Sequence, residues 1–396
     1  MRESPRRTET WREYLRESYL VFDRRTLGLT RICLGFYLFM DLFRRTPDWE
    51  HMFGDRGVLP TWVILQRQQS GGNFSLLHGF TSAPELWALW AVILATYVML
   101  LVGWRTKIWQ ITSLLFVTSM NGRVLLIENG GYVVQNLLLL WTAFLPLGDR
   151  FSLDAMRASL KRVRERTAAD LDDRSEHDAP EKSSPFYSFT GLAIVLQLSA
   201  IYYFNVVHKT GPAWHNGTAV HYVLYNDRMA TPLVAAVREH VPFWAIKIMT
   251  PLVLVAEGSL PFCLLLPRLE IRGVQVKTWL KRLAIVLICF LHIGFGSSFV
   301  LGPFAWALCI FSTLLFSTAD WEVASRAMRR TARRRTVLFD PSSGAAFGLC
   351  RVASRMDRFE LLHFEEASSA EERRHGIAVR LPRASSSRSI VPSARS

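Results

Sequence analysis

The chain has 396 residues, of which 50% are hydrophobic, and it carries a formal charge of +14. This apolar load is high for a soluble protein, and it lies in blocks close to the length that a helix needs to cross about 30 Å of hydrocarbon. The basic residues lie between these blocks and form no compact binding motif, which argues against a nucleic-acid partner and is typical of the loops of a protein in a lipid bilayer.

The apolar blocks predict eight transmembrane helices, because a backbone inside lipid must satisfy its hydrogen bonds internally. The first block is unusual in carrying Arg31 and Asp41, and the third is short. The expected fold is an all-α polytopic membrane protein, with helices near residues 27–43, 84–103, 107–121, 131–147, 187–208, 243–267, 283–301 and 303–319.

Charged segments suggest the domain boundaries. We expect a cytoplasmic N-terminal segment over 1–26 and a transmembrane domain over 27–322. Within that domain, the polar stretch 154–185 predicts a cytoplasmic linker between two four-helix halves. The Ser- and Arg-rich end, 383–396, is expected to be disordered.

The distribution of Lys and Arg predicts the orientation in the membrane. With the tail beyond the last block left out, the loops on the side of the N-terminus hold 22 of these residues, and the loops on the other side hold eight. Because cytoplasmic loops are enriched in Lys and Arg, both termini are expected in the cytoplasm and Lys209 on the outer side.

Neither the cysteines nor the histidines predict a metal site. Four of the five cysteines lie in apolar blocks, where cysteine behaves as a small hydrophobic residue. His208, His215 and His221 are close in sequence, but the pair Gly211-Pro212 interrupts the helix that would align them. We expect histidines that make local interface contacts.

Lys209 ends the fifth block and is followed by a Gly-Pro turn and Trp214. An ionisable group at such a position is costly unless it is paired or used. A lysine acts as a base only in its neutral form, which apolar neighbours such as Tyr203 favour. The structural alternative is a lysine that extends to the membrane surface and anchors the helix.

Two further ionisable residues lie within predicted helices. Glu257 is a functional candidate by its position alone, with Lys247 or His292 as its expected partner. His292 precedes Gly294 and Gly296, which allow close helix approach or room for a ligand. The alternative for His292 is a hydrogen bond across a helix pair.

A series of short motifs, taken together, resembles the HTTM membrane domain, whose members are bacterial relatives of the vitamin K-dependent gamma-carboxylase. The resemblance covers about residues 20–322. The motifs are Arg31-Ile32 with Gly35, Asp55-x-Gly57-Val58-Leu59-Pro60, Gly103-Trp104-Arg105-Thr106, Asn121-x-Arg123, Asn129-Gly130-Gly131, Leu145-Pro146-Leu147-Gly148, Ser152-Leu153-Asp154-Ala155, and the Lys209 segment with Gly217-Thr218-Ala219.

The resemblance implies a multi-pass protein of the inner membrane that uses a reduced quinone and no metal. In that family a lysine deprotonates the quinone, which reacts with oxygen, and the product removes a proton from a glutamate of a secreted peptide so that carbon dioxide is added. Lys209 matches the lysine and His292 a second functional histidine. The expected supporting residues are Glu257, Trp214, Tyr203 and Asn129.

Two departures from the family leave a second function open. Gly130 stands where the carboxylase has a histidine, and no counterpart of its large substrate-binding domain follows the last block. The alternative is a non-carboxylating accessory factor for maturation or export of a secreted peptide. A transporter is less favoured, because no inverted repeat is evident.

The segment 336–382 resembles the thioredoxin-like DCC family and implies a small α/β tail. That family has two cysteines at a turn, of which only Cys350 is present here. A single thiol cannot cycle between dithiol and disulfide, so a degenerate remnant with a scaffold role is expected.

Overall fold

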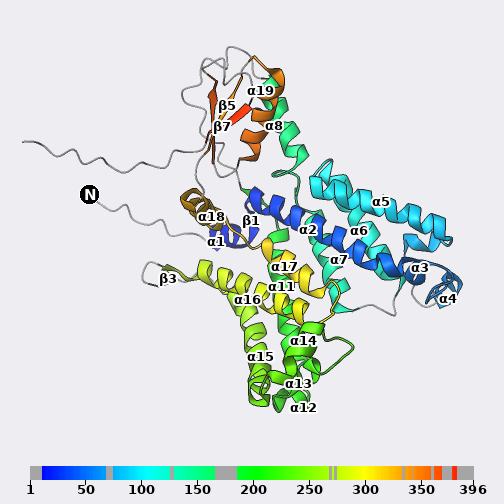
Figure 1. The fold of residues 1–396 in the computed structure, drawn as a ribbon. Helices are drawn as coiled ribbons and strands as arrows, with labels where there is room; N and C mark the ends of the chain where they lie inside the picture. Colours follow the sequence, from blue (N-terminus) through cyan, green and yellow to red (C-terminus); the bar gives the residue numbers. More distant parts are fainter. Residues whose placement is uncertain are drawn as a thin grey trace, which may run out of the picture. The chain divides into compact units, whose positions relative to one another are not determined.

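The protein is described from a computed structural model (Figure 1). The structure divides the chain into two compact units, Met1–Ser317 and Thr318–Ser396. The structure describes residues 11–67, 75–124, 129–165, 185–266, 270–271, 274–331, 335–340, 342–357, 361–367 and 377–380. Most of the predicted linker and the predicted disordered end lie outside these ranges.

Eight helices of the first unit coincide with the eight predicted apolar blocks. They are α2 (Arg24–Arg45), α5 (Ala83–Val102), α6 (Thr106–Arg123), α7 (Gly130–Ala143), α11 (Thr190–Val207), α15 (Phe243–Leu265), α16 (Val276–Ser298) and α17 (Phe304–Thr313).

Five of these helices are long and apolar enough to cross a membrane, namely α2, α5, α11, α15 and α16. The number rises to six if the bent pair formed by Phe304–Thr313 and Thr318–Met328 counts as one span. Neither α6 nor α7 meets these criteria: α6 carries Gln110, Asn121 and Arg123, and α7 has only 14 residues. The described part of the chain is thus a mainly helical protein with five or six candidate spans.

Short elements connect the long helices. On the N-terminal side of α11 they are α1 (Trp11–Leu15), η1 (Arg16–Leu20), β1 (Val21–Phe22), η2 (Thr46–Asp48), α3 (Trp49–Phe53), α4 (Thr61–Arg67), η4 (Leu76–Gly79), α8 (Leu153–Glu165) and β2 (Phe186–Tyr187). After α11 they are α12 (Pro212–His215), α13 (Ala219–Leu224), α14 (Pro232–Val237), η6 (Arg238–His240), β3 (Glu270–Ile271) and β4 (Val274–Gln275).

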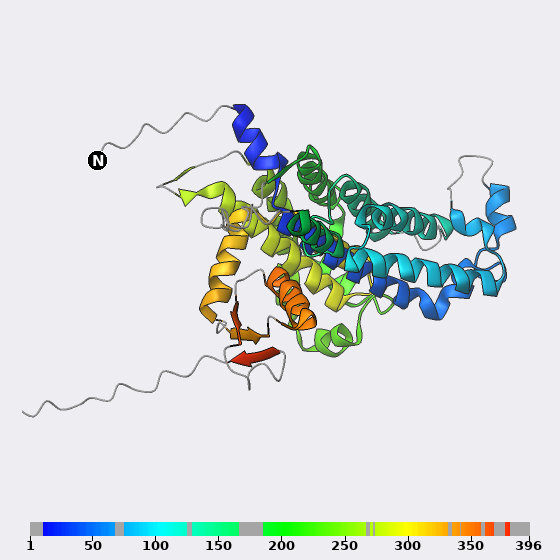
Figure 2. The same cartoon turned by 90° about the horizontal axis from the view of Figure 1, so that it is seen from above.

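The long helices pack in two series that α17 joins. In the first series α2 packs on α5, α5 on α6 and α6 on α7; in the second α11 packs on α15, α15 on α16 and α16 on α17. Helix α17 also packs on α2 and α7, at the centre of the unit in Figures 1 and 2. The buried apolar core is therefore continuous, and includes Leu34, Leu138, Leu198, Ile288 and Phe311.

Hydrogen bonds gather one set of helix ends at a surface that we call the Arg24 face. Arg24, at the start of α2, pairs with Asp149 beyond α7. Arg31 donates to the carbonyl oxygens of Leu100 at the end of α5 (2.8 Å) and of Phe151 (2.6 Å). The strands β1 and β2 pair there in antiparallel fashion, which places the start of α11 beside the start of α2.

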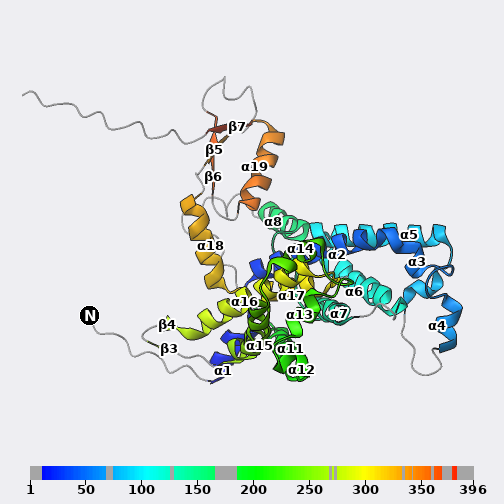
Figure 3. The ribbon, with the colours of Figure 1, turned by 60° about the horizontal axis from the view of Figure 1, so that its bottom comes forward.

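The opposite ends meet at a second surface, the Arg123 face. At the end of α6, Arg123 donates to the carbonyl oxygens of Leu59 (2.8 Å) and Phe53 (3.1 Å). Figure 3 shows α3 and α4 beyond the ends of α2 and α5 on this side. Since Arg45 near the end of α2 also bonds to Asn121 near the end of α6, α2 and α6 run in one direction, and α5, whose end lies at the Arg24 face, runs in the other.

The second unit is a small α/β arrangement. It contains α18 (Thr318–Thr331), β5 (Arg335–Phe339), α19 (Gly344–Met356), β6 (Leu362–Glu366) and β7 (Ile377–Arg380). The sheet has the order β6-β5-β7, in which β5 is parallel to β6 and antiparallel to β7. Cys350 is buried on α19, and burial raises the pKa of its thiol, which makes it a poor nucleophile.

Candidate functional site

Lys209 follows the last turn of α11 and forms an ion pair with Glu257 in the middle of α15. The side chain of Lys209 is 15% exposed and that of Glu257 is 3% exposed. The prediction that Glu257 pairs with Lys247 or His292 is therefore wrong. Helices α11 and α15 pack closely, and the end of α11 lies beside the middle of α15. Lys247 lies in the first turns of α15, away from this contact.

Two more side chains complete the surroundings of this ion pair. The Lys209 Nζ atom lies 4.8 Å from the centre of the Trp214 ring, within the range of a cation–π interaction. Asn205, one turn before Lys209, directs its side chain to the Glu257 carboxylate. The turn at Gly211-Pro212 thus reverses the chain and sets Trp214 against the lysine, which brings together three of the predicted site residues.

His292 is 1% exposed and forms a separate pair with Tyr202. The Tyr202 hydroxyl lies 2.9 Å from Nε2 of His292, across α11 and α16. The rings of Phe295 and Phe304 pack against the imidazole with centroids 5.7 Å and 5.0 Å away. The Nδ1 atom is buried and has no hydrogen-bond partner among the described residues. The sequence pointed to the histidine and missed its partner, because Tyr202 lies in a run of aromatic residues that all look alike.

Lys209 pairs with Glu257 and His292 pairs with Tyr202, so Lys209 and His292 are not partners of each other. The two pairs are connected through α11, which carries Tyr202 and ends just before Lys209. Tyr202 and Lys209 are seven residues apart, about two helical turns. The Tyr202 hydroxyl is close enough to the Glu257 carboxylate to interact with it electrostatically. The structure therefore places two polar pairs, Lys209–Glu257 and Tyr202–His292, next to each other between α11, α15 and α16.

Tyr203 turns away from both pairs and is 55% exposed. It lines an apolar groove of about 560 Å³ between α11 and α15. Almost no polar surface borders this groove, whose other lining residues are Val206, Val207, Gly258, Pro261, Phe262, Leu265 and Leu266. Gly258 directly follows Glu257, so one wall of the groove adjoins the ion pair.

Asn129 belongs to a different part of the unit and contacts none of these residues in the described structure. Its side-chain oxygen accepts a hydrogen bond from the Gly131 backbone (2.8 Å) and caps α7. A Cβ atom at Gly130 would have no neighbour within 4 Å. The position where the family carries a histidine is therefore open, although glycine supplies no side chain to fill it.

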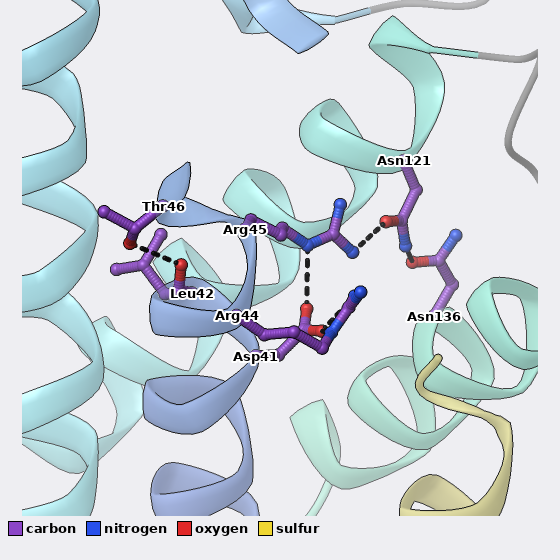
Figure 4. Close-up of polar contacts among 7 residues, drawn as sticks. All are labelled: Asp41, Leu42, Arg44, Arg45, Thr46, Asn121 and Asn136. Atoms are coloured by element: carbon purple, nitrogen blue, oxygen red, sulfur yellow. Dashed lines mark hydrogen bonds and ion pairs between the residues drawn. The ribbon is translucent and has the colours of Figure 1, made fainter. Parts of the chain in front are cut away.

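A second polar cluster, which the sequence did not predict, joins α2, α6 and α7 (Figure 4). The Asp41 carboxylate accepts hydrogen bonds from Arg44 (2.7 Å) and Arg45 (2.9 Å). Arg45 donates to Asn121 (3.2 Å), and Asn121 donates to Asn136 (3.0 Å). The sequence contained one signal of this cluster: Asp41 and Arg45 are four residues apart, which places both side chains on one face of the helix.

The ring of Tyr132 lies 4.9 Å from the Arg45 guanidinium and covers it. Asp41 and Arg45 are both buried, so the charges of this cluster compensate each other inside the helix bundle. We assign it to helix packing, because its described members satisfy one another.

The histidines near Lys209 make local contacts. His208 and His215 each hydrogen-bond through Nδ1 to a carbonyl oxygen four residues earlier, at 2.7 Å and 3.1 Å. His221 packs between the rings of Tyr225 and Phe243. The described residues contain no group of three or more His, Cys, Asp or Glu side chains that could hold a metal ion.

No family model, curated protein or solved structure is significantly similar to this chain. The chemistry of the two polar pairs and their surroundings is therefore the basis of the functional argument.

Proposed function

We propose that this protein is a membrane enzyme of the gamma-carboxylase-like class, in which Lys209 acts as the base on a reduced quinone. The observation that carries the proposal is the nearly buried Lys209–Glu257 pair under the Trp214 ring. An ionisable pair within a membrane bundle is costly to bury, and such pairs mark functional sites more often than structural ones.

Glu257 supplies what a lysine base requires. An ammonium ion cannot accept a proton, but the adjacent carboxylate can take one from it. Transfer from Nζ of Lys209 to the Glu257 carboxylate leaves a neutral amine and a neutral acid. The amine then accepts the proton of the hydroquinone, and His292 with Tyr202 stabilises the negative charge that develops nearby.

The apolar groove supports a lipid-soluble cosubstrate. Its lining residues come from the faces of α11 and α15, and it adjoins Glu257 at Gly258. A quinone bound there by its hydrocarbon tail would bring its ring to the Lys209 pair.

We further propose that all eight helices cross or enter the bilayer of the inner membrane of a bacterium, with the Arg24 face in the cytoplasm. The excess of Lys and Arg in the loops of that face supports this orientation. Lys209 then opens toward the outer side, where α12, α13 and α14 follow it. A secreted peptide would reach the site from there.

A non-carboxylating accessory factor is the second candidate, and Gly130 is the observation that favours it. Among the residues that the structure describes, no side chain able to transfer a proton comes within 4 Å of the position that a Cβ atom of Gly130 would take. In that case the Lys209–Glu257 pair serves to fix the end of α11 against α15.

Turnover of reduced quinone separates the two functions. Purified protein in nanodiscs is given a series of hydroquinones with oxygen, and epoxide formation is followed by chromatography. We expect oxygen-dependent epoxide that Lys209→Ala abolishes and Glu257→Gln lowers at least tenfold. Lys247→Ala is the matched control, since this exposed lysine lies on α15 outside the pair. Absence of epoxide from folded wild-type protein would favour the accessory factor.

A further inference from the structure

Helices α16 and α17 carry two thiols that interact directly with each other, Cys289 and Cys309. Both are free cysteines. The hydroxyl of Ser312 on α17 lies 3.5 Å from Sγ of Cys289 and donates to the backbone carbonyl oxygen of Cys309 (2.7 Å), so Cys289 contacts α17 one turn from Cys309. The contact is between adjacent helices that pack closely, so it does not depend on a loop.

The closeness of the two helices follows from a small residue and a short turn. A Cβ atom at Gly296 would come within 3.0 Å of the Ala305 Cβ atom and 3.1 Å of the Trp306 ring. Between the helices, Gly302 adopts a positive φ of 59°, which lets the chain reverse within five residues. The two cysteines therefore lie on helices whose close approach is set by the backbone.

The thiols lie beside the Tyr202–His292 pair. Cys289 precedes His292 by three residues, about one turn of the same helix. The Tyr202 hydroxyl is close enough to interact electrostatically with both cysteines. The buried Nδ1 atom of His292 has no hydrogen-bond partner in the described part of the chain.

The route to these thiols runs through hydrocarbon. Cys289 and Cys309 are partly exposed, and their neighbours on the same helix faces are large exposed apolar side chains. Val286 is 62% exposed one turn before Cys289 on α16, and Trp306 is also exposed one turn before Cys309 on α17. A reagent that reaches the pair from this side must dissolve in lipid and must accept electrons, since a dithiol is a two-electron reductant. Quinones are the chemical class with both properties.

We propose that Cys289 and Cys309 are a redox-active dithiol that reduces a lipid-soluble quinone. The two S–H bonds break and one S–S bond forms between the helices. Two electrons and two protons pass to the two quinone oxygens, which gives one hydroquinone and one disulfide per chain. Loss of the first thiol proton generates the nucleophilic thiolate, and this proton is one of the two that the quinone oxygens receive.

This step deepens the proposed function, because it supplies the reduced quinone that the Lys209 pair would consume. To that extent it rests on the proposed function. The thiol reaction itself has its own readout, the number of free thiols, which does not depend on oxygen or on epoxide formation. Failure of one proposal is therefore distinguishable from failure of the other.

The test uses the full chain, reduced and held without oxygen in nanodiscs, with tetramethylbenzoquinone as the probe. Full substitution of this ring disfavours addition of thiols, so oxidation is the expected reaction. Hydroquinone is measured by absorbance, and alkylation with peptide mass spectrometry identifies the oxidised cysteines. We expect loss of two of the five thiols, a Cys289–Cys309 disulfide, and one equivalent of hydroquinone.

Three comparisons sharpen the result. Cys289→Ser and Cys309→Ser should each reduce hydroquinone formation at least tenfold, whereas Cys263→Ser, the matched control on α15, should leave it unchanged. Oxidised glutathione, which is hydrophilic, should leave all five thiols free. Wild-type protein that keeps five thiols with the quinone, or that pairs other cysteines, overturns the proposal. So does a quinone adduct on a single cysteine. Because the mapping is done on wild-type protein, a variant that does not fold cannot decide the outcome.

Discussion

At the scale of single residues, the contact between Lys209 and Glu257 decides between the two interpretations of Lys209, a surface anchor and a residue paired inside the helix bundle. The Glu257 carboxylate is removed from water and the Lys209 ammonium is only slightly exposed, so the buried carboxylate is tolerable only because the ammonium compensates it. A lysine that anchored the helix at the membrane surface would point its amine outward. Here the amine points inward to a carboxylate from another helix, beneath an indole ring.

Removing one partner of this pair should destabilise the protein more than removing both. Lys209→Met or Glu257→Leu leaves a charge uncompensated, and a buried pair broken in this way costs about 3–5 kcal/mol. The partial exposure of Lys209 reduces this cost for Glu257→Leu, because water reaches the remaining ammonium.

Chemical unfolding of the two single variants and the double variant in mixed micelles measures the coupling. The expected free energy of unfolding of the double variant lies above that of Lys209→Met. Additive losses would contradict the existence of a coupled pair.

At the scale of elements, close contact between helices depends on a few glycines. Gly35 on α2 packs directly on α5: a Cβ atom there would lie 2.8 Å from the Leu101 Cα atom. Backbone atoms cannot move aside as a flexible side chain can, so this contact sets the distance between the two helices. Gly294 on α16 has nothing within 4 Å of the corresponding position.

Gly35→Ala and Gly294→Ala should therefore change the stability of the protein in opposite directions. We expect Gly35→Ala to destabilise the protein by about 1–3 kcal/mol through overpacking. Gly294→Ala should stabilise it by up to about 1 kcal/mol, since alanine is the better helix former. Thermal unfolding of both variants, followed by circular dichroism, compares them under the same conditions. Equal effects of the two substitutions would show that the α2–α5 contact is not close.

Polar helices are the elements that sequence criteria treat least well. Helix α6 carries three buried polar residues, Gln110, Asn121 and Arg123. It is therefore not apolar enough to count as a candidate membrane span, whereas α5 is. Arg123 donates hydrogen bonds to the carbonyl oxygens of Leu59 and Phe53, so its side chain holds the end of α6 against these segments at the Arg123 face. Composition alone cannot distinguish such a helix from one at a surface.

At the scale of the whole molecule, the proposed orientation with the Arg24 face in the cytoplasm makes a prediction about labelling in cells. Single cysteines are placed in a background without the five native ones. Asp227→Cys, at a side chain that is 79% exposed, should react with a membrane-impermeant maleimide in intact cells. Lys161→Cys, at an exposed position of α8, should react only after the cells are opened. The reverse pattern would contradict the proposed orientation.

The helices themselves were predictable, because each block is a run of mainly apolar residues long enough for several helical turns. All eight blocks coincide with helices, and the boundaries differ by a few residues for most of them. The exception is the eighth, expected near 303–319, where α17 ends at Thr313 and α18 begins at Thr318. Charges at a helix end, such as Lys209, and charges within a block, such as Glu257 and His292, also stood out in the sequence as functional candidates.

The partners of these charges were decided only by the tertiary structure. Lys209 and Glu257 are 48 residues apart, and Tyr202 and His292 are 90 residues apart. No local pattern records which helix packs on which, or how each is rotated. For the same reason the Arg45–Asn121–Asn136 cluster and the Cys289–Cys309 pair were not visible in the chain. The sequence determines hydrophobicity and charge along each helix, and packing across helices determines which side chains meet.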